Sequence, residues 1–171
     1  MKKVLLFFMF FFCLSSAAAE EHPVTLKIIS DYTTDSEECR LGVLFEIKDG
    51  WYIYWKEPGE TGLPTKIDIK LKNGSASALH YPIPKTFKQA GIFTSYGYEK
   101  RVLLWFDLKG VSKNSEVSLL VDWLACGTDL CIPGKQLLKT ELSPTLSETS
   151  SKDLFNLWEK KLPKDPLRYH P

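Results

Sequence analysis

The feature that most constrains this chain is a series of segments in which apolar and polar residues alternate. Turn-forming pairs such as Asp49-Gly50 and Asn73-Gly74 lie between them. The segments are 24–28, 41–47, 67–71, 102–108, 117–123 and 136–142. Alternation with period two indicates half-buried strands. Because no helical pattern interrupts the series, the sequence predicts an all-β protein, an antiparallel β-sandwich.

Residues 81–98 depart from this pattern. Pro82, Pro84, Gly91 and Gly97 interrupt the segment, and its apolar residues do not alternate. We expect a long loop or an edge segment there. Because long loops on rigid scaffolds often carry function, this segment is also a candidate part of a functional site.

The C-terminal part of the chain has a helical pattern. Residues 143–151 are rich in Ser and Thr, which indicates a linker, and Ser150 and Asp153 have the spacing of a capping box. The apolar residues that then recur at helical spacing are Leu154, Leu157 and Trp158. With Pro163 as its end, the pattern predicts a short amphipathic helix docked on the sandwich.

The N-terminus has the layout of a secretory signal peptide. A cationic start at residues 1–3 precedes an apolar run at 4–14, and small residues follow at 15–19. The run is shorter than the roughly 20 residues of a membrane-spanning helix, so we expect cleavage after Ala19, with a retained anchor as the alternative. The expected organisation is a signal peptide at 1–19, one domain at 20–145, and a linker, short helix and tail at 146–171.

Composition excludes several function classes. The net charge is +1 and no long basic block occurs, so no nucleic-acid partner is expected. A zinc site usually needs four Cys or His ligands, whereas His22, His80 and His170 are scattered and no second cysteine pair is present. We therefore expect neither a metal nor a cofactor.

Cys126 and Cys131 flank a predicted hairpin. If the two cysteines face each other, the same register places Asp122 opposite Lys135 and Leu120 opposite Leu137, which are favourable cross-strand pairs. Directly opposite α-carbons lie about 4.5 to 5.5 Å apart, within the range for a disulfide. Closing so short a loop stabilises a protein by only about 2 kcal/mol. From spacing alone, a structural bond and a redox-active bond both remain open.

A third cysteine of the exported chain, Cys39, begins a predicted strand. A small buried hydrophobic role is sufficient to explain it.

Three segments in the same order carry a resemblance. They read "GWYIYWKEPGETGLPT" at 50–65, "FTSYGYEKRVLL" at 93–104 and "VDWLACGTDLCIPG" at 121–134. Together they resemble the N-terminal periplasmic domain of the DsbD/ScsB group of thiol:disulfide interchange proteins, over roughly residues 24–162. The cysteines are separated by four residues, a spacing similar to the ScsB branch.

The resemblance implies an immunoglobulin-like sandwich and a periplasmic thiol:disulfide oxidoreductase. Cys126 and Cys131 would be the catalytic pair. Spacing does not decide which of the two bonds to a partner, and the Ile132-Pro133 pair, as part of a docking surface, favours Cys131. Tyr52 and Tyr54 would line the site. Candidates for a cap that shields the sulfurs are Phe93 and Tyr96.

The resemblance also implies partners. Reducing equivalents would come from a membrane-embedded partner domain by way of a thioredoxin-like domain, and would pass to thioredoxin-fold proteins such as periplasmic disulfide isomerases. The chain would be either one domain of a longer protein or a separate domain with such partners. The alternative function is a non-catalytic immunoglobulin-like binding domain with a structural hairpin disulfide.

Overall fold

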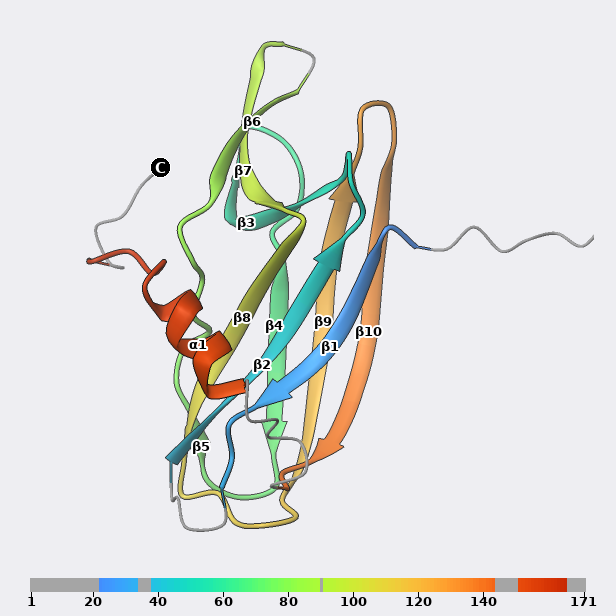
Figure 1. The fold of residues 1–171 in the computed structure, drawn as a ribbon. Coiled ribbons are helices and arrows are strands. Elements are labelled where there is room, and N and C mark those ends of the chain that lie inside the picture. Colours follow the sequence, from blue (N-terminus) through green and yellow to red (C-terminus); the bar gives the residue numbers. More distant parts are fainter. Residues whose placement is uncertain (1–21, 34–37, 90, 144–150, 166–171) are drawn as a thin grey trace, which may run out of the picture.

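The computed structural model describes residues 22–33, 38–89, 91–143 and 151–165, and it is a two-sheet sandwich with one helix (Figure 1). The strands in chain order are β1 (Val24–Ser30), β2 (Glu38–Ile47), β3 (Tyr52–Gly59), β4 (Lys66–Leu71), β5 (Ser75–Ala76), β6 (Lys85–Gln89), β7 (Phe93–Glu99), β8 (Arg101–Lys109), β9 (Glu116–Cys126) and β10 (Cys131–Glu141), and the helix is α1 (Ser151–Glu159). The expected signal peptide, most of the expected linker and Ser150 lie outside the described residues.

Every strand pairing is antiparallel, and the strands form two sheets. One sheet has the order β1-β2-β8-β5, and the other has the order β10-β9-β3-β7-β6, with β4 also paired to β9. The predicted all-β, immunoglobulin-like sandwich is therefore confirmed. The β9–β10 and β6–β7 hairpins project from the same end of the molecule (Figure 1).

The core lies between the two sheets, where the alternating apolar residues of the sequence meet. Phe45 of β2 contacts Trp123 of β9 edge-on across the core, with ring centroids 6.2 Å apart. Both side chains are buried, as are the alternate apolar residues of their strands. Burying one large apolar side chain contributes roughly 1.5–3 kcal/mol, so this shared core supplies the main stabilisation of the sandwich.

Residues 81–98 include β6 and most of β7, an antiparallel pair at the edge of the larger sheet. β6 pairs with β7 over its full length, so the expectation of an edge segment is correct and that of a long loop is wrong. Pro82 and Pro84 precede β6, where a strand needs no backbone donor from them. At Gly97, a Cβ would overlap the carbonyl oxygen of Ile53, so glycine lets β7 pair closely with β3.

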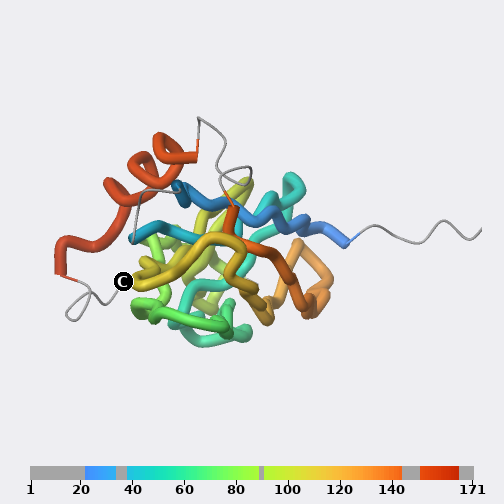
Figure 2. The backbone as a smooth tube through the Cα atoms, turned by 90° about the horizontal axis from the view of Figure 1, so that it is seen from below, coloured from blue at the N-terminus to red at the C-terminus, as the bar shows by residue number. Residues whose placement is uncertain are grey.

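Helix α1 covers the outer face of the smaller sheet. Phe155 and Trp158 are buried, and Phe155 contacts Trp105 of β8 edge-on at 6.2 Å. Arg40 lies over the Phe155 ring at 4.8 Å. The predicted helix is confirmed, but Leu157 is 47% exposed because the buried face is centred on Phe155. Two views show α1 on the opposite side of the molecule from β9–β10 (Figures 1 and 2).

Candidate functional site

The two cysteines bridge the β9–β10 hairpin next to its turn, since Cys126 ends β9 and Cys131 begins β10. Cys131 lies directly opposite Cys126, and their sulfurs form a disulfide of 2.01 Å. The same register pairs Asp122 with Lys135, as predicted, and joins their side chains by an ion pair of 2.9 Å. The hydrophobic pattern of the two strands therefore fixes the register that brings the sulfurs together.

The disulfide lies on the outer face of the larger sheet. Successive side chains of a strand point to opposite faces, so Ala125 faces the core whereas Cys126 faces outward. β3 divides in the same way, with Ile53 in the main core and Tyr52 and Tyr54 outside it. A second apolar cluster results, formed by Tyr52, Tyr54 and Cys126 with Phe87 and Leu124 packed against it. We call this set the sulfur cluster.

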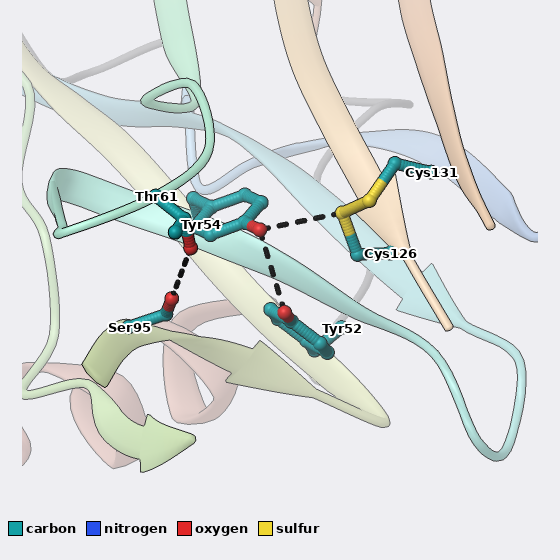
Figure 3. The surroundings of a disulfide bond; sticks show 6 residues. All are labelled: Tyr52, Tyr54, Thr61, Ser95, Cys126 and Cys131. Carbon is teal, nitrogen blue, oxygen red and sulfur yellow. Dashed lines mark hydrogen bonds between the residues drawn. A yellow bond between two sulfur atoms is a disulfide. The ribbon is translucent and has the colours of Figure 1, made fainter. Parts of the chain in front are cut away.

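Two tyrosine hydroxyls form a hydrogen-bonded chain to the disulfide (Figure 3). The hydroxyl of Tyr54 lies 3.3 Å from Cys126 Sγ, and that of Tyr52 lies 3.4 Å from that of Tyr54. A disulfide sulfur carries no hydrogen, so Tyr54 is the donor in the first bond. The Tyr54 oxygen can then accept the hydrogen of Tyr52. The chain therefore directs hydrogen-bond donation toward Cys126.

The two sulfur-bearing residues differ in exposure. Cys126 is fully buried in the sulfur cluster, whereas Cys131 is exposed at the start of β10. A surface hollow beside Cys131 is lined by Tyr52, Phe87, Phe93 and Leu130, among other residues. Leu130 and Phe93 are both exposed, at 54% and 42%. Of the two bonded residues, only Cys131 therefore lies at the molecular surface.

The structure brings together most of the residues that the sequence predicts for the site. Tyr52 and Tyr54 contact each other beside Cys126, and Phe93 lines the hollow with Cys131. Tyr96 does not join them. It lies an odd number of positions from Phe93 along β7, so it faces the other way and packs against the main core.

Sequence reasoning missed Phe87 as a residue of the site. Phe87 of β6 stacks on Tyr52, with ring centroids 4.4 Å apart and ring planes 10° from parallel. The stacking closes the side of the sulfur cluster that faces the β6–β7 hairpin. A phenylalanine in a segment without alternation gives no sequence signal for this position, because its partner is set by the β6–β7 register.

Cys39 lies in a different environment, in β2 of the smaller sheet. Its thiol is free and buried, as expected for a small core residue. Burial, with a smaller effect of the nearby Asp31 carboxylate, raises the pKa of Cys39 to about 12. Since the thiolate is the reactive form, burial and the raised pKa keep the Cys39 thiol in its less reactive, protonated form at neutral pH.

Comparisons with known proteins agree with this geometry. The family model for the N-terminal part of the thiol:disulfide interchange protein DsbD matches residues 20–143. The N-terminal periplasmic domain of ScsB from Proteus mirabilis is similar in structure, with a TM-score of 0.66 and 22% identity, over 84% of this chain and 56% of that one. The chain thus spans little more than half the length of that relative.

A second solved structure is less similar. The reduced N-terminal domain of DsbD from Neisseria meningitidis gives a TM-score of 0.43 and 15% identity, over 68% of this chain and 85% of that one. Comparison with curated proteins gives no match. Within the residues that the structure describes, no helix has the length and apolar character needed to cross a membrane.

Proposed function

Because this chain belongs to the family of DsbD N-terminal thiol:disulfide interchange domains, we propose that Cys126 and Cys131 form a reversible dithiol–disulfide couple. In this role the domain is a thiol:disulfide oxidoreductase that carries two electrons per cycle. The observation that carries the proposal is the asymmetry of the bond, with Cys131 exposed and Cys126 buried. A disulfide with one accessible sulfur is open to exchange at that sulfur.

The exchange proceeds through a mixed disulfide. The thiolate of a reductant attacks Cys131 Sγ, the Cys126–Cys131 bond breaks, and its electron pair leaves on Cys126. A second thiolate of the reductant then attacks the mixed disulfide and releases Cys131 as a thiolate, which takes a proton from water. The reduced pair passes the same two electrons to an oxidised partner by the reverse steps.

The partners are thioredoxin-fold proteins. A thioredoxin-like domain served by a membrane-embedded reductase would be the electron donor, and a periplasmic protein of the disulfide isomerase type would be the acceptor. Apolar residues around Cys131, Leu130 and Phe93 among them, offer a surface for such a partner. In the same proposal Phe87 and Phe93 are the cap residues on the β6–β7 hairpin, since one stacks on Tyr52 and the other lines the hollow beside Cys131.

The proposal includes export to the periplasm. Residues 1–19 would be removed as a signal peptide, residues 20–145 would be the redox domain, and residues 146–171 would hold the linker, helix and tail. Mass spectrometry of the chain recovered from the periplasm should show Glu20 as its first residue. A chain found in the cytosol with Met1 retained would contradict this part of the proposal.

A trapping experiment with a matched pair of variants tests the exchange role. The probe is a purified thioredoxin-fold domain whose second active-site cysteine is replaced and whose first carries a nitrothiobenzoate group. Cys126→Ser leaves the exposed Cys131 free to attack, so we expect a mixed disulfide and release of the coloured thiol. Cys131→Ser leaves only the buried Cys126 of the pair, and capture should fall at least tenfold. If neither variant captures the probe, the disulfide is structural.

A further inference from the structure

Tyr54 is held under a loop whose backbone lies directly on its ring. The loop connects β3 to β4, and a Cβ at Gly62 would overlap the ring atoms of Tyr54. The φ angle of Gly62 is +90°, which L side chains rarely adopt. Glycine is therefore needed at position 62 for two reasons, which are the backbone conformation and the close approach to Tyr54.

The same loop is fastened to β7 by three hydrogen bonds. The hydroxyls of Thr61 and Ser95 lie 2.8 Å apart, and Ser95 is fully buried. The backbone N–H of Glu60 donates to the carbonyl of Thr94 at 2.9 Å, and the N–H of Thr94 donates to the Glu60 carboxylate at 2.7 Å. The Thr61–Ser95 pair lies on the side of the Tyr54 ring away from the disulfide (Figure 3). We call Gly62, Thr61 and Ser95 the tyrosine clamp.

The clamp fixes where the Tyr54 hydroxyl points. The ring is enclosed, with Tyr54 only 1% exposed, and its hydroxyl lies 3.3 Å from a sulfur that is fully buried. When Cys126 leaves as a thiolate, its negative charge forms in a site without access to water. A preorganised donor aimed at a charge that develops in the transition state is most effective in such surroundings.

We propose that Tyr54 is a catalytic hydrogen-bond donor to the Cys126 thiolate, and that the tyrosine clamp positions it; the inference rests on the proposed exchange function. As the attacking thiolate bonds to Cys131 and the old bond breaks, Tyr54 keeps its proton and donates a strengthened hydrogen bond to Cys126 Sγ. Tyr52 can donate a hydrogen bond to the Tyr54 oxygen, which strengthens the donation from Tyr54 to Cys126. The arrangement favours Cys126 as the leaving sulfur and Cys131 as the sulfur that is attacked.

The first test removes one hydroxyl and keeps the ring. The rate of reduction by dithiothreitol is measured for Tyr54→Phe in the full chain. Exchange is faster when the leaving thiol is more acidic, and a hydrogen bond to a charged group is among the stronger ones, so we expect the rate to fall about three- to tenfold. The equilibrium with glutathione should shift toward the disulfide by a similar factor.

Tyr98→Phe is the matched control. The Tyr98 hydroxyl is also buried, and it donates to the carbonyl of Pro82 at 2.7 Å, but it does not contact the sulfurs. Its loss should leave both the rate and the equilibrium unchanged. An equal slowing in both variants would assign the effect to general loosening of the fold and would overturn the inference.

The second test moves Tyr54 without removing its hydroxyl. An added methyl in Gly62→Ala would displace the ring, so we expect a slowing similar to that of Tyr54→Phe. Gly110→Ala is the matched control, because Gly110 also has a positive φ of 65° and its Cβ would meet only the Cα of Gly74 at 3.8 Å. A normal rate in Gly62→Ala and in Tyr54→Phe, with a reducible disulfide, overturns this inference alone. A wild-type disulfide that dithiothreitol does not reduce overturns the proposed function as well.

Discussion

The two faces of the larger sheet are built from the same strands and serve different purposes. On the inner face, Ile53, Trp55 and Val121 are continuous with the core of the sandwich. On the outer face, the same β3 and β9 carry the sulfur cluster, which has few members and two hydroxyls. The exposed Cys131 of β10 lies beside it. The inner face therefore sets the positions of the strands, while the outer face holds the disulfide. Alternation along a strand allows one sequence to do both.

The largest difference between the faces should be in stability. Trp55→Ala removes a fully buried inner side chain, and such substitutions cost about 3–5 kcal/mol. Tyr52→Phe, on the outer face, removes only a hydroxyl and should cost about 1 kcal/mol or less. Urea unfolding of both variants measures the contrast. Similar losses for the two would show that the outer cluster is a structural core of its own.

Reduction of the disulfide should have a smaller effect on stability than loss of the inner tryptophan. The closed loop is short, so breaking the bond should lower the free energy of unfolding by about 2 kcal/mol, and the reduced domain should stay folded. Urea unfolding with and without dithiothreitol measures this loss of free energy of unfolding. A domain that unfolds on reduction alone would show that the bond serves structure rather than exchange.

The buried thiol of Cys39, in the main core, should make the stability of the domain depend on pH. The raised pKa of Cys39 means that the folded thiol stays protonated while the unfolded thiol, with its ordinary pKa of 9.0, ionises. The contribution of the Cys39 thiol to the free energy of unfolding is therefore complete below about pH 9 and is lost progressively up to about pH 12. Between pH 9 and pH 10 the loss should be about 1 kcal/mol. Urea unfolding of the wild type and of Cys39→Ala at both pH values isolates this loss.

A residual alkaline loss should remain in Cys39→Ala. Burial, and to a smaller degree the nearby Asp68 carboxylate, raises the pKa of Tyr81 to about 12 from 10.0. Tyr81 therefore adds a second decline that begins about one pH unit higher. An identical pH profile for the wild type and the Cys39→Ala variant would contradict the assignment to Cys39.

The smallest effect is expected on the exposed part of the outer face. The ion pair between Lys135 and Asp122 lies in the hairpin near the disulfide, but the two side chains are 66% and 38% exposed. Lys135→Ala should change the free energy of unfolding by about 1 kcal/mol or less, and it should not alter the rate of disulfide reduction. A clear change in the rate of disulfide reduction would show that Lys135 takes part in the exchange chemistry and belongs to the site.

The sequence predicted the hairpin more accurately than the surroundings of its disulfide. The register of β9 and β10 could be derived because each strand has one polar and one apolar face, as the Asp122–Lys135 pair shows. β3 was not predicted as a strand, since the run from Tyr52 to Trp55 is buried on both faces and has no alternation to detect. The positions of Phe87 and Tyr96 depend on the β6–β7 register, which the local sequence does not specify.

The most direct test of the central claim is the redox equilibrium of the Cys126–Cys131 bond in the full chain. The protein is equilibrated with glutathione buffers of defined ratio, and the fraction of disulfide is read by alkylation and mass spectrometry, with Cys39 as an unreactive internal reference. We expect full reversibility and a reduction potential above about −300 mV, within reach of exchange partners. A bond that stays oxidised across the series, or a potential well below that value, would contradict the account.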